Sequence, residues 1–161
     1  VNKAKKSHYQ HFYSFQYPLD GIENWNVLYG NKGFYQYQCV IPWEHSQIAI
    51  EELLELIRKA QQGSFLVVLK AFGDMQSEGL LSFPQAGLTL ALDFPNQGEK
   101  TLKLFEVFDQ LVQKYEGKLY MAKDARMTSE FFMQTYENAE QFKKFRDPKI
   151  VSDMSKRLFG Y

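Results

Sequence analysis

The sequence has few of the features that point to the common classes of protein. It contains one cysteine, Cys39, so no disulfide can form within the chain. Its 19 basic and 19 acidic residues cancel, whereas nucleic-acid binders usually carry a basic excess. No apolar run approaches the roughly 20 residues needed to cross a bilayer, and no signal peptide is present. We therefore expect no internal disulfide, no nucleic-acid partner and no transmembrane segment.

Motifs for phosphates and metals are also missing. Gly73, Gly79 and Gly87 are too far apart for a P-loop or a dinucleotide fingerprint. His8 and His11 could touch one metal ion, but no third ligand lies near them in the sequence. The sequence thus predicts neither a metal site nor a phosphate-binding loop.

Apolar residues are abundant, at 45% of the 161 residues, and 16% are aromatic. A chain of this length suits one globular domain that buries roughly 68–70% of its unfolded surface. We expect an irregular N-terminal arm over residues 1–17 and a single domain over residues 18–161. Because the sequence begins at Val1 rather than Met, we expect a fragment or a processed chain.

Hydrophobic periodicity predicts the element order β-α-β-β-α-β, followed by a helical tail. This is an α+β fold with an antiparallel sheet in the ferredoxin-like arrangement and both helices on one face. Cys39 falls within the first strand, as a buried thiol. The expected strands are 34–41, 65–72, 88–94 and 118–121, the helices are 45–62 and 104–115, and the tail helices are 129–136, 138–146 and one starting near 152.

Alternation along the strands assigns several polar side chains to the sheet face without helices. Gln36 and Gln38 share a face in the first strand, and Lys70 and Thr89 lie in the next two strands. The neighbouring side chains on that face are largely apolar. From the pattern alone, a solvated sheet face and a ligand pocket or domain interface are equally compatible.

Lys123 follows the last strand, where the sheet ends and a loop begins. A lysine removed from bulk water can act as a base or as a fixed positive charge beside a developing anion. The alternative is a solvated lysine paired with Asp124, since surface ion pairs are common.

Several segments match one family in order along the chain. They include Pro18-Leu19-Asp20, Asn24-Trp25-Asn26, Gly33 to Gln38, Leu69-Lys70, Asp93-Phe94-Pro95, Tyr120 to Arg126, and Ser152-Asp153-Met154. Over about residues 12–160 the chain resembles the C-terminal, substrate-binding half of the decaprenylphosphoryl-β-D-ribose 2′-oxidase family, in the vanillyl-alcohol-oxidase group of flavoenzymes.

The resemblance implies a cap domain that works with FAD, which would be bound mainly by the chain's own N-terminal FAD-binding domain, absent from this sequence. A sugar C2 hydroxyl, on a polyprenylphosphoryl-ribose-like substrate, would be oxidised by hydride transfer to flavin. An epimerase or reductase partner would then reduce the ketone. The expected location is cytoplasmic or membrane-associated.

Residue roles are also implied by the resemblance. Lys123 would be catalytic, beside the substrate hydroxyl and the flavin. Thr89 and Ala91 stand where mycobacterial members carry Asn and Cys, so covalent capture by inhibitors that need that thiol is not expected. The side chains facing substrate or flavin would be those of Gln36, Gln38, Lys70, Trp25, Thr89 and Ala91.

A second hypothesis needs no catalysis. A stand-alone ferredoxin-like domain could use the same sheet face to bind a small molecule or a partner protein. The coding sequence upstream of Val1 separates the two hypotheses, because only the first requires a flavin-binding domain in frame.

Overall fold

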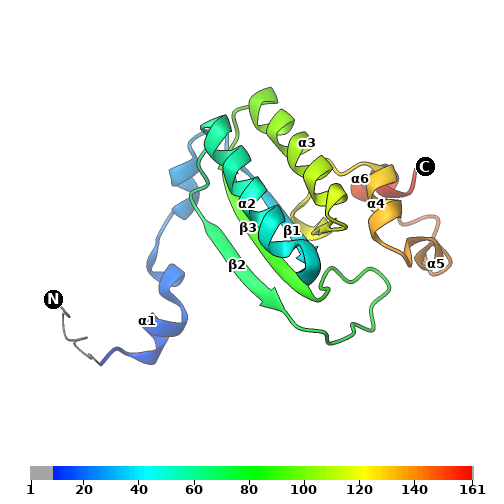
Figure 1. Cartoon of the computed structure of the whole chain (residues 1–161), viewed down its shortest axis with the longest axis horizontal. Coiled ribbons are helices and arrows are strands. Elements are labelled where there is room, and N and C mark those ends of the chain that lie inside the picture. Colours follow the sequence, from blue (N-terminus) through cyan, green and yellow to red (C-terminus); the bar gives the residue numbers. More distant parts are fainter. Residues whose placement is uncertain (1–8, 161) are drawn as a thin grey trace.

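Four antiparallel strands form one sheet in the order β2-β3-β1-β4, in a computed structural model that describes residues 9–160. Two long helices lie across the sheet (Figure 1). This strand order is that of a ferredoxin-like fold, and it confirms the predicted α+β class. The elements are β1 (Phe34–Pro42), α2 (Trp43–Ala60), β2 (Val67–Phe72), β3 (Gly87–Pro95), α3 (Glu99–Lys114) and β4 (Lys118–Leu119).

The last strand is shorter than predicted. β4 ends at Leu119, so the prediction of a strand through Met121 is wrong. The chain makes one more ladder-like bond, from the Tyr120 amide to the Gln38 carbonyl at 2.8 Å, and then turns into the 3₁₀ helix η3 (Met121–Lys123). Sequence periodicity could not find this turn, because it depends on where β1 offers hydrogen-bond partners. The consequence is that Lys123 sits on a helical turn beside the edge of β1.

The C-terminal tail has three short helices: α4 (Ser129–Thr135), α5 (Ala139–Lys143) and α6 (Asp153–Phe159). Ser152 caps α6 as predicted, because its hydroxyl accepts a hydrogen bond from the Ser155 amide at 3.1 Å. Among residues 9–160, no helix has the length and apolar character needed to cross a membrane. That part of the chain also lacks a cluster of His, Cys, Asp and Glu able to hold a metal ion.

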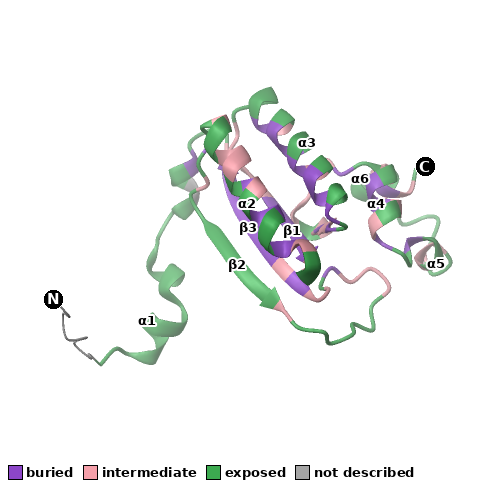
Figure 2. Cartoon of the chain, viewed as in Figure 1, coloured by how far each residue is buried: buried purple, intermediate pink, exposed green. Residues whose placement is uncertain are grey.

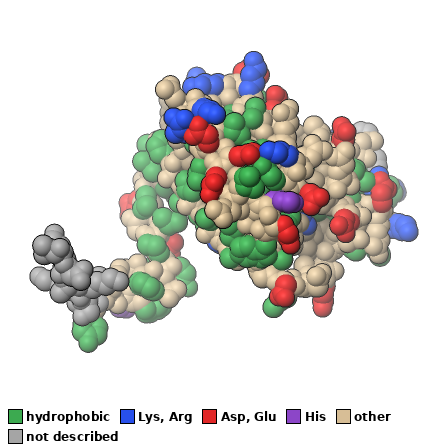
Figure 3. Space-filling view, viewed as in Figure 1, with side chains coloured by type: hydrophobic (Ala, Val, Ile, Leu, Met, Phe, Trp, Pro, Cys, Tyr) green, Lys and Arg blue, Asp and Glu red, His purple; other side chains and the backbone are tan. Residues whose placement is uncertain are grey.

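An irregular arm was predicted for residues 1–17, but the described part of it is not wholly irregular. It contains the short helix α1 (Phe12–Gln16), and the 3₁₀ helices η1 (Pro18–Gly21) and η2 (Trp25–Tyr29) lead from it to the sheet. His8 lies outside the described residues. The arm runs away from the body and carries exposed hydrophobic side chains such as Phe12 and Phe15 (Figures 1 and 3).

The core lies between the sheet and the two long helices. Tyr37, Cys39 and Ile41 of β1 belong to one buried cluster with Phe105 and Phe108 of α3. Because alternate residues of β1 enter this core, the intervening residues face the other side of the sheet. Burial is concentrated in β1, β3 and the inner sides of α2 and α3, whereas β2 is exposed along most of its length (Figure 2).

Gly117 allows the end of α3 to return close to β1. A Cβ atom at this position would lie 2.6 Å from Cδ1 of Ile41 and 2.6 Å from the carbonyl oxygen of Val40. The second contact is with backbone, which cannot rotate away. Gly117 therefore sets how closely β4, and the segment that carries Lys123, approaches the sheet.

We predict that Gly117→Ala lowers the free energy of unfolding by about 1–3 kcal/mol, as is typical of an overpacked core. Gly63→Ala is the matched control, since nothing lies within 4 Å of its Cβ position. Cys39 offers a second readout beside denaturant titration: it is wholly buried, and burial raises the pKa of its thiol to about 12. Its labelling under native conditions should accelerate in the Gly117 variant. Equal free energies of unfolding for the two variants would show that a Cβ atom at position 117 fits against Ile41 and Val40 without cost.

Candidate functional site

The polar residues predicted to share one sheet face do so. In the strand register Gln36 lies opposite Asp93, Gln38 opposite Ala91, and Lys70 opposite Thr89. Residues directly opposite each other in an antiparallel pair project to the same side. That side is the one away from α2 and α3, because the alternate residues of β1 and β3 enter the helix-covered core.

This face is not bare along its whole length. Thr89 is fully buried and Gln38 is 7% exposed. The covering material is the long β2–β3 loop, whose buried Phe83 stacks on Tyr120 at 4.7 Å and meets the edge of Phe72 at 6.1 Å between ring centroids. Because Phe72 and Tyr120 lie toward opposite edges of the sheet, the loop crosses one end of the face, while Tyr29 of η2 covers Asp93 at the other end.

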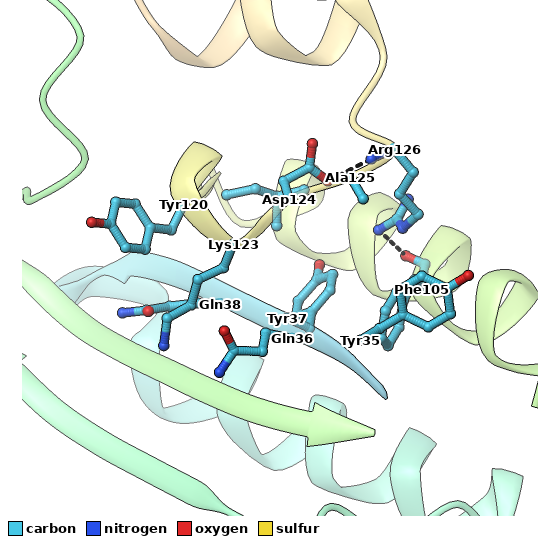
Figure 4. A pocket seen from close by; sticks show the side chains of 11 residues that line it. Tyr35, Gln36, Tyr37, Gln38, Phe105, Tyr120, Lys123, Asp124, Ala125 and Arg126 are labelled. Atoms are coloured by element: carbon cyan, nitrogen blue, oxygen red, sulfur yellow. Dashed lines mark hydrogen bonds between the residues drawn. The ribbon is translucent and has the colours of Figure 1, made fainter. Parts of the chain in front are cut away.

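Lys123 reaches this face from the edge of the sheet. β4 pairs only with the second half of β1, so the segment from Tyr120 to Arg126 crosses the unpaired first half. Half-buried Lys123 extends from η3 over β1 on the side of Gln36 and Gln38 (Figure 4). These three side chains line one hollow with a free volume of about 20 Å³, which is room for about one water molecule. The arrangement is a shallow, open site rather than a closed ligand cavity.

Asp124 is not the partner of Lys123. Its carboxylate accepts hydrogen bonds from the backbone amides of Arg126 at 3.1 Å and Met127 at 2.9 Å, and from Nη1 of Arg157 at 2.9 Å. Within residues 9–160, Lys123 makes no ion pair at all. The interpretation of Lys123 as half of a surface pair with Asp124 is therefore wrong, and its ammonium is left for another partner.

A second ion pair holds the far end of the same segment. The Arg126 guanidinium donates two hydrogen bonds to the Asp109 carboxylate, at 2.6 and 2.7 Å, and lies over the Phe105 ring at 5.2 Å. Asp109 also accepts a hydrogen bond from the Tyr37 hydroxyl at 3.0 Å. Burial raises the pKa of the Asp109 carboxyl, while Arg126 and Tyr37 act in the opposite direction. The close, two-bonded contact between Arg126 and Asp109 therefore offsets the free-energy cost of removing both charges from water.

Both glutamines of the site are oriented by neighbours on β3. Nε2 of Gln36 donates to Oδ1 of Asp93 at 3.0 Å, and Nε2 of Gln38 donates to Oγ1 of Thr89 at 3.0 Å. Asp93 also accepts a hydrogen bond from the hydroxyl of Tyr29 at 2.9 Å. Burial, together with this bond, raises the pKa of Tyr29 to about 12. Sequence analysis missed Asp93 as a site residue, although it shares the face and stands opposite Gln36.

The remaining expected site residues lie around this centre. Ala91 is next to Gln38 on β3 and is nearly buried. Lys70 is exposed on β2, with Nζ 5.7 Å from the Phe72 ring centroid, and does not line the hollow. Trp25 is 48% exposed and packs edge-on against Phe34 at 5.4 Å, at the end of β1. The structure therefore brings Gln36, Gln38 and Lys123 together and leaves Lys70 and Trp25 on the margins.

We predict that Arg126→Met destabilises the protein by about 3 kcal/mol, because removing one member of a largely buried pair leaves the other charge without compensation. Arg58→Met is the control: Arg58 also donates two hydrogen bonds of 2.7 Å to a carboxylate, that of Glu55, but its side chain is 72% exposed. Loss of that pair should change stability by less than about 1 kcal/mol. Similar losses measured by urea unfolding for both variants would contradict the role given to Arg126.

No protein-family model matches the chain. Two known proteins are similar to it over most of its length. A decaprenylphosphoryl-β-D-ribose oxidase of Mycolicibacterium smegmatis is 37% identical over 157 residues, which is 92% of this chain and 33% of that protein. An uncharacterised protein from the mprA 5′ region of Streptomyces coelicolor is 33% identical over 148 residues, 87% of this chain and 39% of that protein. The chain spans 33% and 39% of the length of these two relatives, and it is related to one part of an oxidase.

Proposed function

We propose that this chain is the substrate-side part of an FAD-dependent oxidoreductase that oxidises a sugar hydroxyl. The observation that carries the proposal is half-buried Lys123, which has no ion-pair partner within residues 9–160 and lies beside two oriented glutamines, in a chain 37% identical to an oxidase. The substrate class would be a polyprenylphosphoryl ribose, as the name of that relative indicates, and the family resemblance implies oxidation of its C2 hydroxyl.

In this reaction the carbinol carbon gives up a hydride and its hydroxyl releases a proton to solvent, so that a carbonyl forms. Flavin would supply the hydride acceptor. The task of Lys123 is electrostatic: its ammonium would donate a hydrogen bond to the reacting oxygen and stabilise negative charge that develops nearby. A positioned donor of this kind supplies about 3–4 kcal/mol of transition-state stabilisation.

The residues of the open face fit a flavin that is placed against them rather than enclosed by them. The hollow at Lys123 has a free volume of only about 20 Å³, so a second surface must complete the site. The described residues offer that surface a cation, two amide groups and, at the margin, the exposed ring of Trp25. We therefore assign tight FAD binding mainly to another domain of the same protein, which would be this chain's principal partner.

Two further partners follow from the proposed chemistry. A lipid-linked sugar would be the substrate, and a reductase or epimerase would consume the ketone. Thr89 and Ala91 lie against Gln38 on the site face, where a thiol is implied for mycobacterial members. An alanine there removes a nucleophile without removing any hydrogen bond described above, so the proposed oxidation would not require that thiol.

We predict that Lys123→Ala in the full-length protein lowers kcat by about 10²–10³-fold, while flavin absorbance shows that the cofactor remains bound. Lys103→Ala is the matched control, because Lys103 is an exposed lysine on α3. The measurement is flavin reduction with polyprenylphosphoryl ribose under anaerobic conditions. An active Lys123 variant would remove this residue from the mechanism.

We also predict that FAD titrated into the 161-residue chain alone gives no stoichiometric complex, whereas the full-length protein retains FAD through gel filtration. The reason is that the site on this chain is open on one side. Tight binding of FAD by the short chain would contradict the assignment of FAD binding to another domain. Absence of flavin from the full-length protein would favour a non-catalytic binding domain.

A further inference from the structure

Asp93 stands out among the groups to which the proposed reaction gives no task. It is a buried carboxylate, 4% exposed, on the site face of β3. Within residues 9–160 no Lys, Arg or His pairs with it. Burying a carboxylate without a countercharge is costly, so the position calls for an explanation beyond packing.

The two side-chain partners of Asp93 are both obliged to donate. A carboxylate is an acceptor only, so the Tyr29 hydroxyl and the Gln36 amide nitrogen must point their hydrogens at it, at 2.9 and 3.0 Å. An asparagine would fit the same space and could also satisfy both neighbours. Its single carbonyl oxygen accepts from one neighbour only, so its amide nitrogen donates to the other, either to Oε1 of Gln36 or to the Tyr29 hydroxyl oxygen, and Gln36 is no longer obliged to donate.

The orientation of Gln36 therefore decides what the site presents to a ligand. With Nε2 turned to Asp93, Oε1 of Gln36 accepts no hydrogen bond from the described part of the chain. Gln38 is arranged in the same sense, with Nε2 bound to Thr89. The wall beside Lys123 is thus a pair of carbonyl acceptors next to one cation, and it suits a ligand whose hydroxyl groups donate.

We propose that Asp93 is a positioning residue that fixes the hydrogen-bonding polarity of the site, by holding Gln36 as an acceptor for a substrate hydroxyl. The inference rests on the proposed function for its substrate, a polyhydroxylated ring, and it extends that function by naming what sets the selectivity. The same carboxylate secures Tyr29, whose ring stacks on Phe34 at 4.1 Å and meets Trp25 at 5.9 Å. One side chain therefore aligns both Gln36 and the segment at the margin of the site.

The decisive variant is Asp93→Asn in the full-length protein, because it keeps the shape and removes the obligation on Gln36 to donate. We expect KM for polyprenylphosphoryl ribose to rise about tenfold, the equivalent of about 1.4 kcal/mol, with kcat changed less than about threefold. Asp20→Asn is the matched control, since Asp20 also accepts a hydrogen bond from a tyrosine hydroxyl, at 3.1 Å from Tyr13, but in an exposed position.

Two further measurements exclude a merely structural role. In a Gln36→Met background, Asp93→Asn should leave KM unchanged, because Asp93 acts through Gln36. A substrate analogue with fluorine in place of a ring hydroxyl that is not oxidised accepts but cannot donate. The wild type should disfavour it about tenfold, and the Asp93→Asn variant should lose most of that discrimination. An equal KM effect in both backgrounds, or unaltered discrimination, would overturn the proposal.

A readout without turnover separates this inference from the proposed function. The side-chain amide of Gln36, assigned by its loss in Gln36→Met, should show a downfield proton in NMR spectra of the wild type that disappears in Asp93→Asn. If that signal changes as expected but no sugar is oxidised, the orientation by Asp93 stands and the oxidase function fails. If the signal does not change, Asp93 does not orient Gln36.

Discussion

The candidate site depends on how the segment from Tyr120 to Arg126 is fastened across the open edge of β1. One end is fixed by the hydrogen bond from the Tyr120 amide to β1. The other is fixed by the paired hydrogen bonds between Arg126 and Asp109 of α3. Arg157, on the last helix, holds the middle through Asp124. Lys123 lies between these attachments, so three distant parts of the chain set the position of one ammonium.

That fastening also explains why a lysine here can act differently from a lysine on an ordinary surface. Asp124 would neutralise Lys123 if its carboxylate were free, but Arg157 and two backbone amides already occupy it. The positive charge is thus kept beside Gln36 and Gln38 without a partner in the described part of the chain. Charge placed in advance, where anionic character develops, is the feature that electrostatic catalysis requires.

Sequence patterns were sufficient for the fold and for part of the site. Period-two alternation placed Gln36 and Gln38 on the face away from the helices, and the strand register agrees. Helical spacing found α2 and α3, although α3 begins at Glu99, five residues before its first predicted residue. These signals succeed because they are local and repeat many times within one element.

Contacts between residues far apart in the sequence could not be predicted from such local patterns. Tyr29 and Asp93 are 64 residues apart, and Asp109 and Arg126 belong to different elements. No periodicity reports such contacts, and an aspartate in a strand reads as an exception to the pattern rather than as a site. The burial of Gln38 and Thr89 was missed for a similar reason: it comes from Phe83, in a loop without regular structure that folds back over the sheet.

Strand β2 has a consequence of a different kind. Its outer edge has no neighbouring strand, and Val67 and Leu69 on one side and Val68 on the other are each more than a third exposed. Open apolar edges of this type invite intermolecular strand pairing, and a charged lysine is a common safeguard against it. Lys70 supplies the lone charge within β2. By this argument Lys70 protects the edge of β2 against such pairing, so we expect its replacement to lower solubility, whatever its part in ligand recognition.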